Sequence, residues 1–505
     1  NSKRYRYMKK NITRRQFLAT AGIGAAGLSV PQIAHSALAG RKKRKPNIIL
    51  IMSDDVSPDL YGCYGNDSVK TPNIDFMARE GVQFQTAWAT AICSPTRAMI
   101  MTGRYANQTG FYHNNLYVPQ KGETKDLHKY HHSFAKLMKQ TGYATAIAGK
   151  WHLGKGTPYS EEGGFDEYCL WESIGEIRKL SGDQEFRGGW ENDNTTARYW
   201  HPGIVQNHKL LDTKPDDFGP DIFTDFICDF VERKKDQPFL VYYPMVAPHG
   251  TRVGPSTNPK RGTVGEIQKS ADSEENAARF QSMNEYIDVL VGRIIQQVQD
   301  LGLLENTIII YCSDNGSGST AKSRAVERGC RVPFVAYGGP VKKRGITTEL
   351  TDLTDILPTL LDYAGSKLPP DYRVDGTSLK PFFSGETDQH RDWIYSTIGT
   401  SQLVRTKRYL LEAVNPILDM PRGRFYDCGD SRDGYGYINV TNSEDQQVQK
   451  ARTEFDQILK KYPPLTKDHP FFQTKRGRKV LGGFTSVKYA RRHLHNHKDF
   501  RRYEE

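Results

Sequence analysis

The chain has 505 residues, of which 37% are hydrophobic, 11% aromatic and 25% charged. This is the composition of a globular protein, and it excludes a disordered, collagen-like or disulfide-scaffold chain. The net charge of +12 is concentrated at the ends: residues 1–45 and 474–505 carry +12 and +7, whereas residues 46–473 carry −7. Because the body is mildly acidic, the basic overall charge does not indicate a nucleic-acid binder.

The N-terminal segment has the organisation of an export signal. Residues 8–39 begin with basic residues, continue with an apolar run over 17–30 and end in a small-x-small cleavage pattern. The stretch TRRQFL at 13–18 resembles a twin-arginine signal. We therefore predict a twin-arginine-type signal peptide over 1–39, with 1–7 as an extension of the gene model. The prediction includes the twin-arginine export machinery as a partner, a periplasmic or secreted bacterial location, and no transmembrane anchor after processing. The alternative is a short buried helix.

The body alternates predicted strands with predicted helices. Apolar runs rich in β-branched residues predict strands over 47–52, 82–88, 143–148, 239–243, 307–312 and 332–337. Helical periodicity and end signals predict helices over 74–80, 95–101, 133–140, 275–301 and 350–363. This alternation is typical of an α/β fold with a large, mostly parallel or mixed sheet flanked by helices.

Polar residues follow several of these strands directly. Asp54 and Asp55 follow the first strand, His249 comes after the strand at 239–243, and Asp314 and Asn315 follow the strand at 307–312. Open α/β sheets place their sites at the carboxyl ends of the strands. We therefore expect a site at this edge of the sheet.

The pattern changes near residue 385. Short strands predicted over 393–398, 402–405 and 409–411, joined by tight turns, precede a helix predicted over 451–462. We predict a catalytic domain over 46–385, a smaller C-terminal α+β subdomain with an antiparallel sheet over 386–472, and a weakly patterned basic tail over 473–505.

A set of motifs identifies a family resemblance. Cys93 to Arg97 read CSPTR and are followed by MTGR at 101–104. This signature resembles that of the type I, formylglycine-dependent sulfatases of the alkaline phosphatase superfamily. Further landmarks of that family occur in order within 46–385, at residues 47–55, 71–75, 149–154, 247–249, 313–316 and 322–333. The combination is far more specific than any one motif.

The resemblance implies that Cys93 is oxidised to formylglycine (3-oxoalanine) by a maturation enzyme. Hydration of the aldehyde gives a geminal diol: one hydroxyl attacks sulfur, and the other expels the sulfate from the resulting adduct. A thiol or a simple alcohol would retain the sulfate. The alternative for Cys93 alone is an inert buried thiol. The seven cysteines are odd in number and none has C-x-x-C spacing, so their pairing stays open.

The resemblance also implies one metal ion per chain. Asp54, Asp55, Asp314 and Asn315 match the family's ligands, and the modified residue 93 completes the set. Hard oxygen donors suit Ca²⁺, with Mg²⁺ the less favoured ion. The alternative reading of Asp54 and Asp55 is turn or capping chemistry after a strand.

Five further residues match family positions around the sulfate. Arg97 would hold the nucleophile and the metal-side oxygens, while Lys150 and Lys322 would bind sulfate oxygens. His152 would assist the diol, and His249 would protonate the leaving oxygen with Lys322 beside it. For an isolated histidine, a structural role is the alternative.

The substrate is the least determined feature. Export and the aromatic residues of segment 154–214, namely Trp171, Trp190, Tyr199 and Trp200, favour a sulfated carbohydrate or polysaccharide. Ordinary packing of these rings is the alternative. A phosphonate monoester or phosphodiester hydrolase of the same superfamily is the enzymatic rival to sulfate ester hydrolysis. A non-catalytic carbohydrate-binding relative is the rival from another class, and it should lack one of the site residues. We expect no nucleic-acid partner.

Overall fold

The computed structural model describes residues 44–114, 116–118, 126–154, 157–172, 174–182, 198–249, 273–318, 320–432 and 434–486. The predicted signal peptide over 1–39 therefore lies outside the described residues. Those from Lys45 onward belong to one compact unit. Within the described ranges, no helix has both the length and the apolar character that a membrane span needs.

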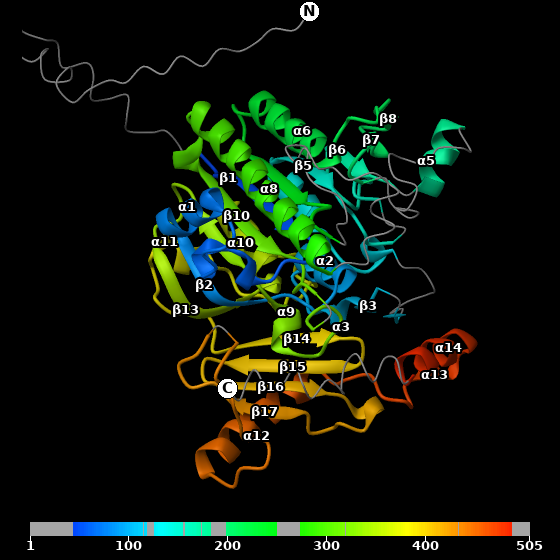
Figure 1. The fold of residues 1–505 in the computed structure, drawn as a ribbon, viewed down its shortest axis with the longest axis vertical. Helices are drawn as coiled ribbons and strands as arrows, with labels where there is room; N and C mark the ends of the chain where they lie inside the picture. The colour runs from blue at the N-terminus through cyan, green and yellow to red at the C-terminus, as the bar shows by residue number, and fades with distance from the viewer. Residues whose placement is uncertain are drawn as a thin grey trace, which may run out of the picture. The chain divides into compact units, whose positions relative to one another are not determined.

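An 11-stranded mixed sheet forms the centre of this unit (Figure 1). Its order is β11-β2-β12-β10-β1-β9-β5-β6-β7-β8, with β13 also paired to β2. The neighbours β10, β1, β9 and β5 run parallel, whereas β12 runs antiparallel to β10. The strands are β1 (Asn47–Ser53), β2 (Val82–Trp88), β5 (Ala144–Gly149), β6 (Glu167–Trp171), β7 (Ile204–Gln206), β8 (Lys209–Leu210), β9 (Phe239–Pro244), β10 (Thr307–Ser313), β11 (Arg331–Val332), β12 (Phe334–Tyr337) and β13 (Gly345–Asp352). The predicted α/β class is confirmed.

Helices cover both faces of this sheet because the side chains of a strand alternate between faces. Ile49 and Ile51 of β1 pack with α1 (Pro72–Glu80), α6 (Gly219–Arg233) and α8 (Ser273–Asp300). Figure 1 shows α6 and α8 side by side across that face. Ile48 and Leu50 point the other way, into a core shared with α2 (Cys93–Thr102), α4 (Phe134–Gln140), α10 (Ile356–Tyr363) and α11 (Lys380–Ser384).

A second, antiparallel sheet is formed by the C-terminal part of the chain, as predicted. Its order is β14 (Trp393–Ile398), β15 (Ser401–Thr406), β16 (Tyr409–Val414), β17 (Arg424–Asp427) and β18 (Ile438–Asn439). The remaining elements include the hairpin β3 (Phe111–His113) and β4 (Leu116–Tyr117), with helices α3 (Ala106–Thr109), α5 (Ile174–Ser181), α9 (Glu327–Cys330), α12 (Gln446–Lys461), α13 (Pro470–Gln473) and α14 (Lys475–Phe484). The domain boundaries at 385 and 472 stay predictions.

Three predicted elements differ from the structure. The predicted helix over 350–363 is wrong in its first part, because residues up to Asp352 continue β13 beside β2. Asp352 and Asp355 then form a capping box, and α10 begins only at Ile356. The predicted strand over 332–337 is split at Pro333, which has no backbone N–H to donate. The tail expected to be weakly patterned contains the regular helix α14.

A buried ion pair joins the antiparallel sheet to α9. Glu327, the first residue of α9, accepts from Arg405 of β15 at 2.9 Å, and neither side chain is exposed. Tyr437 also donates to Glu327 at 2.7 Å. The antiparallel sheet thereby holds the segment that follows Lys322.

Replacement of Arg405 by methionine should lower the free energy of unfolding by about 3–5 kcal/mol, because it leaves the buried carboxylate of Glu327 unpaired. Arg408→Met is the matched control: Arg408 pairs with Asp427 but is 55% exposed, so its loss should change the free energy by about 1 kcal/mol or less. Urea denaturation of both variants measures the difference. Equal, small effects would contradict an anchoring role for Arg405.

Candidate active site

The candidate site lies where the four parallel central strands end. Backbone hydrogen bonds continue the sheet past the strands: Asp54 N donates to Ala247 O at 3.0 Å, and Lys150 N donates to Pro244 O at 2.7 Å. Asp314 N likewise donates to Ser53 O at 3.1 Å. The strand ends that the sequence places far apart therefore meet at one edge of the sheet, as parallel pairing requires.

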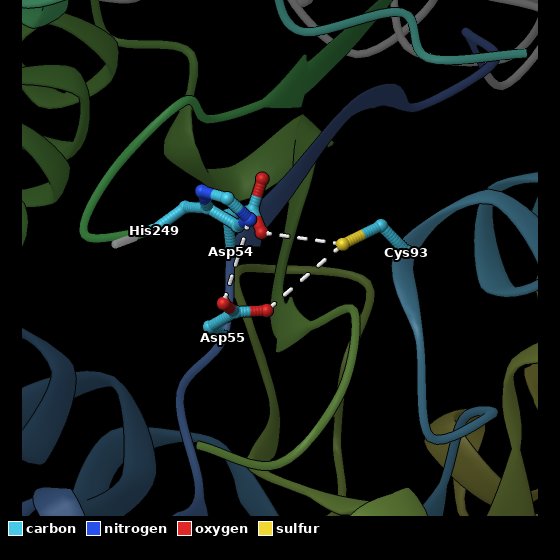
Figure 2. A group of neighbouring side chains, drawn as sticks. All are labelled: Asp54, Asp55, Cys93 and His249. Carbon is cyan, nitrogen blue, oxygen red and sulfur yellow. Dashed lines mark hydrogen bonds and ion pairs between the residues drawn. The ribbon is translucent and has the colours of Figure 1, made fainter. Parts of the chain in front are cut away.

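Cys93 is the first residue of α2 and faces the carboxylates at this edge (Figure 2). Its Sγ lies 3.6 Å from Asp54 Oδ1 and 3.9 Å from Asp55 Oδ1, and the residue is fully buried. The next residue fixes the helix start, because Ser94 N donates to Asn114 Oδ1 at 2.9 Å. The Ser94 hydroxyl donates to the carbonyl of His152 at 2.9 Å. The turn after β5 is thereby tied to α2.

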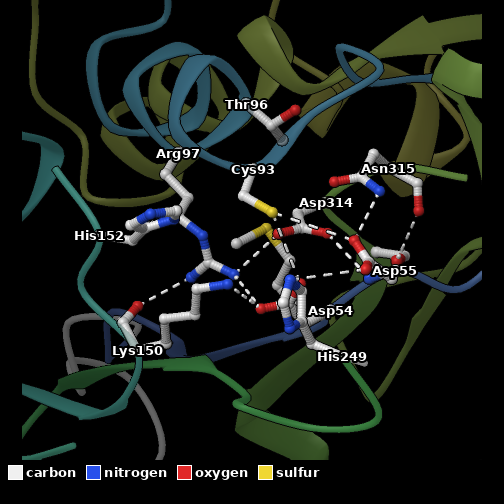
Figure 3. Close-up of polar contacts among 12 residues, drawn as sticks. Asp54, Asp55, Cys93, Thr96, Arg97, Lys150, His152, His249, Asp314 and Asn315 are labelled. Carbon is white, nitrogen blue, oxygen red and sulfur yellow. Dashed lines mark hydrogen bonds and ion pairs between the residues drawn. The ribbon is translucent and has the colours of Figure 1, made fainter. Parts of the chain in front are cut away.

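Two cations lie on the Asp54 side of Cys93 (Figure 3). Arg97, one helical turn along α2, donates through Nη2 to Asp54 at 3.2 Å and to Asp314 at 2.8 Å. Its Nη1 donates to the carbonyl of Lys150 at 2.8 Å, and Lys150 Nζ in turn donates to Asp54. Arg97 and Lys150 are both buried, so these charges are compensated within the site.

Asp55 organises the other side of the site. Its backbone has φ 68°, in the left-handed region that non-glycine residues seldom adopt. Its side chain accepts from Lys322 Nζ at 2.5 Å and from Asn315 Nδ2 at 2.8 Å. His249 Nε2 lies 3.7 Å from Asp55 Oδ2, and Asp314 Oδ1 accepts from Asp55 N at 3.0 Å.

The buried carboxylates repel one another. Burial, followed by repulsion from Asp54, raises the pKa of Asp55 to about 6, and the same two causes raise the pKa of Asp314. Burial also opposes ionisation of Asp54, but Lys150, His249 and Arg97 outweigh it and hold the pKa of Asp54 well below its usual value. A divalent cation would relieve this repulsion.

Burial and nearby charges also shift the pKa values of the neighbouring groups. It raises the pKa of the Cys93 thiol, with Asp314 adding to the effect. It lowers the pKa of His249 to about 3, against the opposing influence of Asp54. For Lys322, the negative groups outweigh burial and raise the pKa.

The residues fit a hard divalent cation. Ligand atoms of Asp54, Asp55, Cys93 and His249 all lie within 4.8 Å of one another. Asn315 Oδ1 is buried and accepts no hydrogen bond from any described residue, which leaves a neutral oxygen donor beside the carboxylates. The oxygen donors of Asp54, Asp55, Asp314 and Asn315 suit Ca²⁺, and His249 lies beside them with its Nε2 3.7 Å from Asp55 Oδ2.

Every residue of the predicted set lies at this edge of the sheet, with one difference in detail. His152 is tied to the site through its backbone carbonyl and has φ 57°, and its side chain is exposed.

The aromatic residues expected to favour a carbohydrate do not all have the same surroundings. Tyr199 and Trp200 are buried and pack against Phe218, so ring packing is the correct reading for these two. Trp190 lies outside the described residues.

Sequence reasoning missed Arg198. Its Nη1 lies 2.9 Å from His249 Nδ1, and its guanidinium lies over the Trp171 ring at 4.8 Å. No motif marks this arginine. The aromatic residues at 171 and 199–200 were the available signal, because an arginine between aromatic rings often packs on one of them.

Comparisons with known proteins agree with this geometry. A sulfatase family model matches residues 46–366. The chain is 30% identical to an ulvan-active sulfatase of Formosa agariphila over 64% of the chain and 63% of that protein, so the match spans less than two thirds of the relative. It is 26% identical to an N-acetylglucosamine-6-O-sulfatase of Bacteroides thetaiotaomicron, over 69% of the chain and 73% of that protein.

Solved structures show the same fold. A structure described as being in complex with its substrate D-glucosamine-2-N,6-O-disulfate covers 85% of this chain and 99% of its own, with a TM-score of 0.62 and 23% identity. A phosphonate monoester hydrolase of Agrobacterium radiobacter covers 82% and 95%, with a TM-score of 0.58 and 21% identity. At these identities the likeness concerns architecture, and the chemistry is argued from the site.

Proposed function

The chain belongs to the sulfatase family, a family of sulfuric ester hydrolases, and we propose that it hydrolyses the sulfate ester of a sulfated carbohydrate. The observation that carries the proposal is the meeting of Cys93 with Asp54 and Asp55, flanked by Lys150 on one side and Lys322 on the other. A reactive position beside paired carboxylates and flanking cations suits attack on an anionic ester.

The proposed nucleophile derives from Cys93 by conversion to formylglycine, which would supply a hydrated aldehyde with one hydroxyl for attack and one for release. A bound Ca²⁺ would supply Lewis acidity at a sulfate oxygen. The side chains of Asp54, Asp55, Asp314 and Asn315 would hold that ion.

The other side chains have separable roles in the proposal. Arg97 and Lys150 lie on the Asp54 side and would orient the nucleophile and bind sulfate oxygens. Lys322 would bind the sulfate from the Asp55 side. His249 would hold a proton at Nε2 beside the leaving oxygen, and His152 would assist the release of sulfate.

Export is part of the same proposal. The signal-like segment over 1–39 supports a periplasmic or secreted enzyme that meets polymeric carbohydrate outside the cytoplasm. Conversion of Cys93 by a maturation enzyme would precede passage through the twin-arginine machinery, which carries folded proteins. An amino-terminal sequence of the protein recovered from the periplasm would test the cleavage site near residue 39.

Desulfation of a panel of defined sulfated mono- and oligosaccharides tests the proposed function. We expect release of free sulfate from at least one carbohydrate, with 4-nitrophenyl sulfate also turned over. The rival activity is phosphonate monoester or phosphodiester hydrolysis, favoured only by the structural likeness to the Agrobacterium enzyme. Faster turnover of an aryl phosphate diester than of the aryl sulfate would favour the rival.

The modification predicts a defined mass change. In enzyme produced together with its maturation partner, the peptide containing Cys93 should lack one sulfur and two hydrogens and contain one additional oxygen, because CH₂SH becomes CHO. Peptide mass spectrometry measures this change directly. Enzyme produced without the partner should retain the thiol and have little activity. Full activity in protein that retains the thiol would contradict the modification.

The metal prediction has a binding readout as well as an activity readout. Chelation should abolish turnover, and Ca²⁺ should restore it better than Zn²⁺, because oxygen donors dominate the site. Calorimetry should show one Ca²⁺ bound per chain. Asp314→Asn removes a charge without changing shape and should weaken that binding, whereas the exposed Asp388→Asn should not. Unchanged calcium affinity in Asp314→Asn would contradict the assignment.

A further inference from the structure

Arg198 approaches His249 from the side away from the reacting centre. Arg198 Nη1 lies 2.9 Å from His249 Nδ1, while the other ring nitrogen, Nε2, lies 3.7 Å from Asp55 Oδ2. Figure 2 shows the His249 ring directed toward the Asp54–Asp55–Cys93 group. The two ring nitrogens therefore face different surroundings: a cation at Nδ1 and the candidate active site at Nε2.

This contact determines where the imidazole carries its proton. A guanidinium has only donor N–H groups and remains protonated, so it cannot accept a hydrogen bond from a histidine. Nδ1 of His249 must therefore accept, and it cannot hold a proton while that contact persists. The neutral ring then carries its single proton at Nε2, the nitrogen that faces the site.

Arg198 is itself held firmly. It is buried, and its guanidinium lies 4.8 Å from the centre of the Trp171 ring and 5.9 Å from that of Tyr199. The Tyr199 hydroxyl donates to the carbonyl of His249 at 3.0 Å and to that of Val246 at 3.1 Å. The pair Arg198–Tyr199 thus fixes both the ring and the backbone of the segment that carries His249.

A close backbone approach allows this arrangement. Gly219 begins α6, and a Cβ at this position would lie 2.2 Å from the carbonyl oxygen of Arg198. Gly219 N donates to Tyr199 O at 2.7 Å. Arg198 and Tyr199 therefore rest on the first turn of α6 at a contact that only glycine permits.

We propose that Arg198 is a positioning residue for His249: by donating to Nδ1 it holds the imidazole with its proton at Nε2, directed at the leaving oxygen of the substrate. The inference rests on the proposed sulfatase function. As the ester S–O bond breaks, negative charge develops on the departing oxygen, and Nε2–H donates a hydrogen bond to it. The guanidinium at Nδ1 polarises the ring and strengthens that donor.

Direct contact between Arg198 and the substrate is the competing role. A guanidinium beside an active site can bind a carboxylate or sulfate of the substrate, in which case its loss raises KM for substrates that carry that group. A positioning role instead lowers kcat, and lowers it most where the leaving oxygen needs most stabilisation. On a substrate that has no second anionic group, loss of Arg198 should therefore lower kcat if Arg198 positions His249. It should leave kcat unchanged if Arg198 binds an anionic group of the substrate.

Arg198→Met tests the proposal, because methionine keeps apolar bulk against Trp171 and removes every donor. The probes are phenyl sulfate, whose leaving group has a pKa of about 10, and 4-nitrophenyl sulfate, whose leaving group is better stabilised. We expect kcat for phenyl sulfate to fall by about 10–100-fold, as when an outer partner of a functional histidine is lost. The variant should retain most of its kcat for 4-nitrophenyl sulfate, which also shows that it folds.

Two further variants complete the experiment. In a His249→Ala background, Arg198→Met should cause no additional loss on phenyl sulfate, because its effect passes through that ring. Arg233→Met, which removes a surface arginine paired with Glu167, should leave both substrates unaffected. Equal losses on both probes, an unchanged kcat for phenyl sulfate, or additive losses in the double variant would each overturn the proposal.

The position of the proton supplies a readout independent of turnover. Nitrogen-15 spectra of histidine-labelled protein, with His249 assigned from its absence in His249→Ala, should show the tautomer protonated at Nε2 in the wild type. Arg198→Met should lose that preference. A wild-type ring protonated at Nδ1 would overturn the inference even in an active sulfatase, whereas absence of sulfate ester hydrolysis by the wild type would overturn the proposed function.

Discussion

Replacement of Cys93 by serine should stop turnover and still permit one covalent reaction per chain. Cys93 Sγ lies 3.6 Å from Asp54 Oδ1, so a serine hydroxyl would occupy the same setting. Its oxygen would form a bond to sulfur as the ester S–O bond breaks, and its proton would leave with the alcohol. Without a second hydroxyl on the same carbon, the resulting enzyme sulfate ester has no route to release sulfate.

We expect steady-state turnover by Cys93→Ser to fall by about 10⁶-fold, the scale observed when a hydrolase loses its nucleophile. Intact-protein mass spectrometry after incubation with 4-nitrophenyl sulfate should show one added SO₃ group. Peptide mapping should locate that group on the peptide that contains residue 93. Cys93→Ala is the matched control and should show neither turnover nor adduct. Sustained turnover by the alanine variant at the wild-type rate would show that residue 93 is not the nucleophile.

The sequence predicts much of this site because the site is built at strand ends. Asp54 and Asp314 each follow an apolar run, and β1 and β10 pair in parallel from Asn47 with Thr307 to Ser53 with Ser313. Apolar patterning locates such strands, and parallel pairing then brings their carboxyl ends together. The family motifs add residues outside the strands, such as Lys322.

Other features depend on tertiary contacts that leave no local pattern. Arg198 is one arginine in an irregular segment, and its contact with His249 depends on how closely the chain approaches α6 at Gly219. The misassigned segment at 350–363 has the same origin. Its apolar residues suit a strand or a helix, and pairing with β2 selects the strand up to Asp352.

Replacement of His249 by alanine should damage the hydrolysis of sugar sulfates far more than that of activated aryl sulfates. His249 lies beyond the end of β9, with Nε2 3.7 Å from Asp55 Oδ2 on the Lys322 side of the site. Cleavage of a sugar sulfate must expel a strongly basic alkoxide, so a proton or hydrogen bond at the departing oxygen contributes greatly to the rate. A nitrophenolate is stable enough to leave with little assistance.

We expect kcat of His249→Ala to fall by about 10²–10⁴-fold on the sulfated sugar that the wild type hydrolyses fastest, the usual range for loss of a general acid. The decrease on 4-nitrophenyl sulfate should be much smaller. His469→Ala, which removes a histidine at the start of α13, controls for general effects of the substitution and should change neither rate. If His249→Ala lowers both rates equally, His249 binds the substrate or supports the structure. Lys322, whose Nζ lies 2.5 Å from the same Asp55 carboxylate, would then be the better candidate for the group that stabilises the leaving oxygen.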